Sequence, residues 1–215
     1  MKKKKTIQRT TKNTSRRAAT VVSDNGDSDR ERFERILKKF TFEWECVFDR
    51  QGRVIAEEDP DDPGGVSKYG IDKSGHPNLS AAQIRNLTEE QAAEIYYAGE
   101  WTDAHASELA VPLGEIAFDM TVLDGRGRAM RALQGACGLT GADIDGGWGS
   151  ITRKAATETA QDQNRLMRAA DRMLDRRAAR YHNLVEENPK LGKFLKGWLN
   201  RTDALREFLD VPDVV

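Results

Sequence analysis

The sequence has no long apolar run and few of the residues that bind metals or form disulfides. No stretch approaches the roughly 18 consecutive apolar residues expected of a membrane span. The 215 residues include only two cysteines and three histidines. The cysteines lie far apart, and neither they nor the histidines show metal-ligand spacing; these residues are Cys46, Cys137, His76, His105 and His182. We therefore expect no metal site and no cofactor.

The basic N-terminus also lacks the apolar segment of a secretion signal. Such a signal carries about 7–15 apolar residues behind its positive charges. The only candidate is Ala-Ala-Thr-Val-Val at residues 18–22, which is too short. We therefore expect synthesis in the cytoplasm, where both cysteines remain thiols.

Charge is balanced overall but unevenly distributed along the chain. There are 34 Lys and Arg against 35 Asp and Glu, a net charge of −1. Residues 1–22 hold eight of the bases and no acid, so the rest carries 26 bases against 35 acids, or −9. We expect residues 1–27 to form a disordered basic tail. It is either simply solvated or attracted to an anionic wall or membrane surface. Nucleic acid is not expected as a partner, because no aromatic residues are interleaved with the bases.

Local signals place a helix and a hairpin in the first third of the chain. Ser28-x-x-Glu31 is a capping box, which predicts a helix start. Apolar residues then repeat at helical spacing, which predicts a packed helix ending near Glu45; they are Phe33, Ile36, Leu37, Phe40 and Trp44. Residues 46–48 and 54–56 then read as two short strands with Gly52 in the turn.

The segment after this hairpin combines carboxylates with residues that fix a backbone. It reads DPDDPGG over residues 59–65 and continues as SKYGI over residues 67–71. Alone, it indicates a tight solvent-exposed turn. Following a glutamate at a helix end, it suits cleavage of a glycosidic bond. One acid then protonates the leaving oxygen while a second stabilises the cation or activates water.

These residues resemble glycoside hydrolase family 108, the phage and bacterial N-acetylmuramidases with a lysozyme-like fold. The resemblance rests on the order acid, hairpin, Asp-Pro-x-Asp-Pro-Gly-Gly, hydroxyl residue, x, Tyr-Gly-Ile. Two departures stand out. The family has Gly-Gly after the acid, where this chain has Cys46 and Val47, and it has Thr where this chain has Ser67. The gap from Glu45 to Asp62 is also longer than in the family, which suggests an extended hairpin.

The resemblance implies a peptidoglycan hydrolase that cuts the β-1,4 bond between N-acetylmuramic acid and N-acetylglucosamine. Glu45 would be the general acid, and burial beside Trp44 and Phe48 would disfavour its ionised form. Asp62 would be the ionised partner, with Asp59 as the alternative. Sequence leaves open whether the reaction inverts or retains configuration, because the distance between the carboxyls decides this.

The remaining site residues are also implied by the resemblance. Ser67 would hold the attacking water. The backbone around the sugar would be shaped by Asp59, Gly64, Gly65, Tyr69 and Gly70. Two rival functions stay open. A lytic transglycosylase would need only the glutamate and would leave 1,6-anhydro ends. A protein that kept the fold without the two glycines would bind the wall and cut nothing.

A second helix is predicted from the capping box Thr88-x-x-Gln91 onward. Its aromatic residues Tyr96 and Trp101 are either core residues or part of the glycan cleft. A third apolar run, from Leu109 to Val122, contains Asp119, which we interpret as a structural hydrogen-bond acceptor.

The last part of the chain predicts further helices. A short helix around 129–134 ends at Gly138, and two long amphipathic helices follow, separated at Pro189. The order Leu-Gln, Asp-Gly, Gly-x-x-Thr resembles the helical peptidoglycan-binding module that commonly follows this catalytic domain. We interpret its Asp-Gly as a turn, since the acceptor spacing of a calcium loop is missing.

These signals together predict a mainly α fold, an α+β lysozyme-like lobe with a small β-hairpin followed by a helical module. The predicted domains are a catalytic domain over 28–122 and a peptidoglycan-binding domain over 123–212. We expect an endolysin-like monomer whose partner is bacterial peptidoglycan, reached after release or export.

Overall fold

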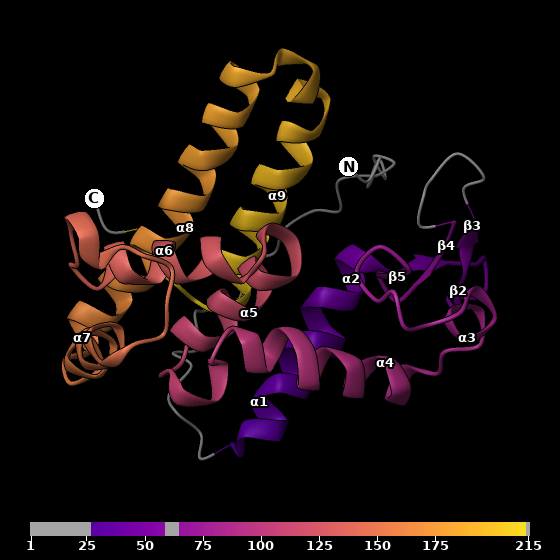
Figure 1. The fold of residues 1–215 in the computed structure, drawn as a ribbon, viewed down its shortest axis with the longest axis horizontal. Coiled ribbons are helices and arrows are strands. Elements are labelled where there is room, and N and C mark those ends of the chain that lie inside the picture. Colours follow the sequence, from indigo (N-terminus) through magenta and orange to yellow (C-terminus); the bar gives the residue numbers. More distant parts are fainter. Residues whose placement is uncertain (1–26, 59–64, 214–215) are drawn as a thin grey trace, which may run out of the picture. The chain divides into compact units, whose positions relative to one another are not determined.

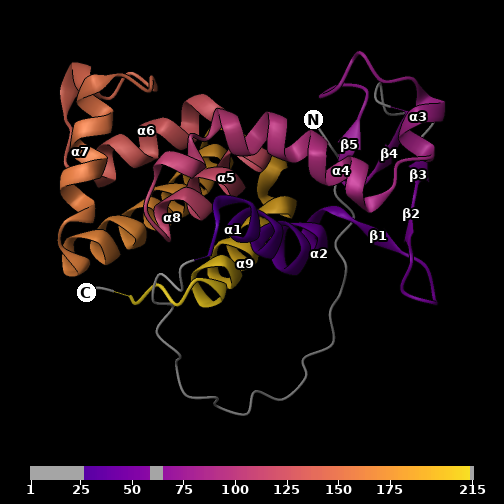
Figure 2. The same ribbon diagram turned by 90° about the horizontal axis from the view of Figure 1, so that it is seen from below.

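The computed structural model describes residues 27–58 and 65–213. The fold is mainly helical with a few short antiparallel strands, which confirms the predicted fold class (Figures 1 and 2). The described chain divides into two compact units, residues 28–102 and residues 103–213, called here the N-terminal and C-terminal units. The domain boundary predicted after residue 122 falls inside the C-terminal unit. The basic tail lies outside the described residues, apart from Asp27.

The first helical stretch of the N-terminal unit starts at the predicted capping box. The Ser28 backbone N–H donates to Glu31 Oε2 at 2.7 Å, and the Glu31 N–H donates back to Ser28 Oγ at 3.3 Å. The predicted apolar residues from Phe33 to Phe40 are buried, which confirms a packed helix. It is not one regular α-helix, because a π-helical segment interrupts it. Its three parts are α1 (Asp29–Ile36), the π-helical η1 (Leu37–Thr41) and α2 (Phe42–Glu45).

A second helical stretch packs against the first through a shared aspartate. Trp101 is 1% exposed, and its indole Nε1 donates to Asp29 Oδ1 at 3.1 Å. The neighbouring Tyr97 hydroxyl donates to Asp29 Oδ2 at 2.7 Å. Of the two roles considered for Trp101, the structure therefore supports the core. The helical segments here are α3 (Ala81–Arg85), α4 (Glu89–Tyr96) and the π-helical η2 (Tyr97–Trp101).

Short antiparallel strands connect these helical stretches. The predicted hairpin is present, with Val47 opposite Ile55 and Phe48 opposite Val54. A second, three-stranded sheet in the order β3-β4-β5 was not predicted. The strands are β1 (Val47–Phe48), β2 (Val54–Ile55), β3 (Glu57–Glu58), β4 (Val66–Lys68) and β5 (Ile71–Asp72).

The C-terminal unit is built from helices around α5 (Leu113–Asp124), which is buried from Leu113 to Thr121. Helix α5 packs on α6 and α8, and α8 forms a hairpin with α9. The hairpin breaks at Pro189, as predicted, and α6 ends before Gly138, whose φ of 91° suits a helix terminus. The other segments are η3 (Ala106–Glu108), α6 (Arg126–Ala136), η4 (Gly141–Asp143), α7 (Ser150–Ala160), α8 (Gln163–Glu187), η5 (Pro189–Leu191) and α9 (Gly192–Phe208).

A buried ion cluster ties three of these helices together. Asp119 on α5 is wholly buried, and its carboxylate pairs with Arg177 Nη1 at 2.7 Å and Arg201 Nη2 at 2.6 Å. Burial alone would raise the pKa of Asp119, but the two guanidinium groups hold it below its usual value. Asp119 is thus a structural acceptor, as its sequence context predicted.

A buried glutamine organises the turn that leads into α7. The Gln134 amide Nε2 donates to Asp145 Oδ1 at 2.7 Å and to Thr152 Oγ1 at 2.9 Å. Its carbonyl Oε1 accepts from the Gly146 N–H at 2.9 Å. The Leu-Gln, Asp-Gly, Gly-x-x-Thr order is therefore a hydrogen-bonded turn held from α6.

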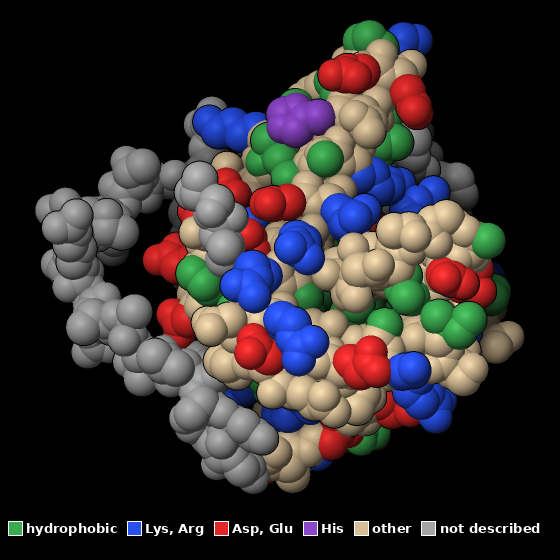
Figure 3. All heavy atoms as spheres, turned by 90° about the vertical axis from the view of Figure 1, so that its left-hand side faces the viewer, with side chains coloured by type: hydrophobic (Ala, Val, Ile, Leu, Met, Phe, Trp, Pro, Cys, Tyr) green, Lys and Arg blue, Asp and Glu red, His purple; other side chains and the backbone are tan. Residues whose placement is uncertain are grey.

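The surface carries both signs of charge. On the face shown in Figure 3, Lys and Arg side chains are interspersed with Asp and Glu. Within the described residues, no helix is long and apolar enough to cross a membrane.

Candidate functional site

Glu45 is the last residue of α2, at the point where the helix passes into β1. Its side chain is half-buried, so it is held by the packed helix yet remains accessible. Sites carried on packed elements keep their geometry better than sites on loops. The chain leaves the helix at Cys46, whose φ of −93° and ψ of 147° are ordinary extended values. A glycine is therefore not required at this position.

A two-residue turn from the second sheet lies directly against Glu45. It is formed by Tyr69 and Gly70, which join β4 to β5 with φ values of 55° and 77°. Two-residue hairpin turns of this type need positive φ at both positions. A Cβ placed on Gly70 would lie 2.8 Å from Glu45 Cβ and 3.1 Å from Glu45 Oε2. Only a glycine fits here, and it brings bare backbone to the carboxylate.

The phenol of Tyr96, at the end of α4, also contacts this turn. Its hydroxyl donates to the Tyr69 carbonyl oxygen at 2.9 Å in a buried hydrogen bond. The same hydroxyl oxygen would be 2.7 Å from a Cβ on Gly70. The rings of Tyr69 and Tyr96 also pack on Phe42 of α2, with centroids 5.2 and 6.1 Å away. Tyr69 is 9% exposed, so it meets this site mainly through its backbone.

Ser67 lies in the middle of the three-stranded sheet. Its strand partners are Glu57 on β3 and Asp72 on β5. Residues directly opposite in antiparallel strands project from the same face, so a hydroxyl lies between two carboxylates. Asp72 is 3% exposed, and its Oδ1 accepts from the Gly75 N–H at 2.8 Å.

Three predicted site residues, Asp59, Asp62 and Gly64, lie outside the described residues. Their proposed roles stay predictions. Gly65 is described, is exposed and has a φ of 66°, and a Cβ there would meet nothing within 4 Å. The structure therefore brings Gly70 and Tyr69 to Glu45, and it places Ser67 on the strand that leads to them.

The apolar surroundings expected for Glu45 are only partly present. Trp44 is half-buried, with its ring centroid 6.2 Å from that of Phe40, whereas Phe48 is 43% exposed on β1. The following residue, Cys46, is 3% exposed, and burial followed by the charge of Glu45 raises its pKa to about 12. Its thiol therefore stays protonated and unreactive near neutral pH.

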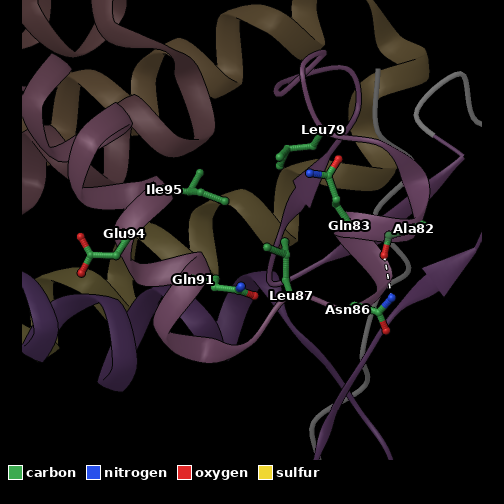
Figure 4. Close-up of a pocket in the computed structure, with 8 residues that line it drawn as sticks. All are labelled: Leu79, Ala82, Gln83, Asn86, Leu87, Gln91, Glu94 and Ile95. Atoms are coloured by element: carbon green, nitrogen blue, oxygen red, sulfur yellow. Dashed lines mark hydrogen bonds between the residues drawn. The ribbon is translucent and has the colours of Figure 1, made fainter.

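The N-terminal unit also has a hollow of about 570 Å³ between α3 and α4. Figure 4 shows the side-chain amides of Gln83 and Gln91 beside the apolar Leu79, Leu87 and Ile95. Amides can donate and accept hydrogen bonds, and the apolar groups can pack on a methyl or ring face. Such a lining suits a ligand that carries both kinds of group.

Sequence reasoning missed two residues of this region, Tyr96 as a support of the turn and Asp72 opposite Ser67. Tyr96 carried only the signal of a core aromatic at helical spacing. Asp72 could have been noticed through Asp-x-x-Gly, a common turn pattern. Neither signal reveals that Tyr96 contacts the turn or that Asp72 lies opposite Ser67. Among the residues that the structure describes, no group of three or more His, Cys, Asp or Glu is arranged to hold a metal ion.

Two families match successive parts of the chain. Residues 39–125 match the family described as glycosyl hydrolase 108. Residues 128–203 match the family described as a predicted peptidoglycan domain. The solved structure of SagA from Brucella abortus is similar, with a TM-score of 0.64 and 23% sequence identity over 86% of this chain and 97% of that chain. At this identity the likeness shows a shared fold. No curated protein matches the sequence.

Proposed function

Because the chain belongs to the glycosyl hydrolase 108 family and carries a predicted peptidoglycan domain behind it, we propose that it is an N-acetylmuramidase. The two matches support a peptidoglycan hydrolase. The proposed bond is the β-1,4 link between N-acetylmuramic acid and N-acetylglucosamine. The observation that supports it best is Glu45 itself, a half-buried acid at the end of a packed helix, with its carboxylate held beside the Tyr69-Gly70 turn.

In the proposed reaction Glu45 is the general acid. Its carboxyl gives a proton to the glycosidic oxygen as the bond from that oxygen to the anomeric carbon breaks. Positive charge develops on the anomeric carbon and ring oxygen, and a second carboxylate stabilises it or activates water. We assign that role to Asp62, with Asp59 as the alternative. Ser67 would hold the water by a hydrogen bond.

The hollow between α3 and α4 is consistent with a substrate of N-acetylated sugars. An acetamido group offers an N–H, a carbonyl and a methyl, which match the amides of Gln83 and Gln91 and the apolar Leu87. The C-terminal unit would hold the enzyme on peptidoglycan, and the protein would act at the cell wall. The basic tail would add attraction to an anionic wall or membrane surface.

The test is mass spectrometry of soluble fragments released from purified sacculi by the parent protein, Glu45→Gln and Glu43→Gln. Glu43 is an exposed acid on the same helix and provides the matched control. We expect reducing muramic-acid ends from the parent and from Glu43→Gln. Loss of a general acid typically costs about 10²–10⁴-fold in rate, so Glu45→Gln should release almost nothing.

Other products would point elsewhere. Anhydro-muramic ends would identify a lytic transglycosylase. Sacculus binding without fragments from any of the three proteins would identify a wall-binding protein. If the products are those of a muramidase, replacing Asp62 and Asp59 separately by Asn would identify the second catalytic carboxylate. Only the true partner of Glu45 should lose activity to an extent comparable to Glu45→Gln.

A further inference from the structure

The turn beside Glu45 is held in a conformation that its own residues do not favour. Tyr69 has a φ of 55°, and a residue with a Cβ is disfavoured there by roughly 1–2 kcal/mol. Such a conformation persists only where surrounding contacts fix it. Besides the pairing of β4 with β5, one contact that does so is the buried hydrogen bond from the Tyr96 hydroxyl to the Tyr69 carbonyl oxygen, at 2.9 Å.

The same hydroxyl also limits how far the turn can move. A Cβ on Gly70 would be 2.7 Å from the Tyr96 hydroxyl oxygen and 2.8 Å from Glu45 Cβ. The Gly70 Cα therefore faces the phenol hydroxyl and the acid together, with no space for a side chain between them. Phe42, on the helix that carries Glu45, packs on both tyrosine rings and completes the contact.

We propose that Tyr96 is a positioning residue for the glycosidase reaction, whose hydroxyl holds the Tyr69-Gly70 turn against Glu45. This rests on the proposed function. Tyr96 is 3% exposed and acts through the turn rather than on the sugar. If the turn relaxes away from Glu45, the carboxyl gains rotamers and water, and the proton is no longer aimed at one oxygen. Misplacement of a reacting group by about 1 Å can cost about 10²-fold in rate.

The neighbouring Tyr97 offers a matched control. Its hydroxyl also donates a hydrogen bond, to Asp29 at 2.7 Å, but that bond joins helices away from the turn. Tyr96→Phe and Tyr97→Phe therefore each remove one phenol hydrogen bond from the same helical stretch. Only Tyr96→Phe releases the turn.

Two readouts are needed for each variant. The first is steady-state hydrolysis of soluble glycan chains, with Tm measured alongside. We expect Tyr96→Phe to lower kcat about tenfold with KM within about twofold, because binding is kept and alignment is lost. Tyr97→Phe should keep kcat within about twofold at a similar Tm.

The second readout does not depend on activity. Cys46 follows Glu45, is 3% exposed, and lies close enough to help raise the pKa of Tyr69, after burial and Glu89. In a Cys137→Ala background, its labelling by a thiol reagent measures opening between α2 and the turn. We expect labelling about tenfold faster in Tyr96→Phe and no comparable change in Tyr97→Phe.

Equal behaviour of the two variants in both readouts would overturn the positioning role. If the parent releases no glycan fragments, the proposed function fails, yet labelling still decides whether Tyr96 holds the turn. Unchanged labelling in Tyr96→Phe would then overturn the inference by itself.

Discussion

Two carboxylates, one from each unit, show opposite uses of burial. Glu45 in the N-terminal unit is half-buried and faces the bare backbone of Gly70. Asp119 in the C-terminal unit is fully buried and is paired with Arg177 and Arg201. The first can reach a ligand and exchange a proton. The second is sealed from solvent and ionised near neutral pH, where it holds helices together.

The structural elements around Glu45 and around Asp119 also differ. Around Glu45 the chain uses short strands and left-handed backbone, which bring the Tyr69-Gly70 turn into contact with the acid. Around Asp119 it uses long helices, and the charges join residues that are 58 and 82 positions apart in sequence. The difference in accessibility fits a structural role for Asp119 and the chemical role proposed for Glu45.

Breaking the buried cluster should have the largest effect on stability. Asp119→Asn removes the carboxylate that pairs with both buried guanidinium groups and leaves Arg177 with its longer contact to Asp124 at 3.4 Å. Breaking a buried pair costs about 3–5 kcal/mol. We expect that loss in urea unfolding of the C-terminal unit. Asp203→Asn, an exposed acid on α9, is the control and should change stability by less than about 0.5 kcal/mol. Equal stability of the two variants would show that the cluster is not structural.

The glycine beside the acid should show the next largest effect. Gly70→Ala places a Cβ 2.8 Å from Glu45 Cβ in a left-handed conformation. We expect a loss of about 2–4 kcal/mol in unfolding free energy. We also expect peptidoglycan hydrolysis to fall at least about 10²-fold, because the acid is displaced.

Gly135 in the C-terminal unit is the matched control for this substitution. A Cβ there would lie 2.6 Å from Arg176 Cζ, which is the far end of a flexible side chain that can move. Alanine is also favoured over glycine inside a helix by about 1 kcal/mol. Gly135→Ala should therefore stay within about 1 kcal/mol of the parent and remain active. A similar loss of stability and activity in both variants would mean that the close contact between Gly70 and Glu45 does not cause the effect of Gly70→Ala.

The smallest expected effect is a pH dependence. Because Arg201 and Arg177 hold the pKa of Asp119 below the unfolded value of about 3.9, its ionised form stabilises the fold above about pH 4. That contribution is lost as pH falls below 4 through the folded pKa. The stability gap between the parent and Asp119→Asn should therefore narrow as urea unfolding is repeated from pH 5 toward pH 2. A constant gap would contradict the ionised state of Asp119.

Local features of this fold could be predicted from sequence. The capping boxes at Ser28 and Thr88 and the helix end at Gly138 depend on residues within a few positions of each other, and all three are present. The position of Glu45 at a helix end followed the same way from the apolar spacing before it.

The other features of the fold and of the site depend on contacts between residues far apart in sequence, which local residue patterns do not predict. Tyr96 meets the Tyr69 carbonyl across 27 residues, and Asp119 meets its arginines across still longer separations. The second sheet pairs strands of only two or three residues, too short for alternation to show. The roles of Asp59, Asp62 and Ser67 stay predictions, since they depend on distances to Glu45.

The two π-helical segments, η1 and η2, have a consequence for how this site tolerates change in length. A π turn contains one more residue than an α turn, so a π segment lets a helix contain one extra residue without ending. Each residue of an α-helix advances the direction of the next side chain by about 100°. Deleting one residue from Leu37–Thr41 would restore regular helix and rotate Glu45 away from Gly70. The number of residues in this segment, more than their identity, therefore sets the direction in which the acid points.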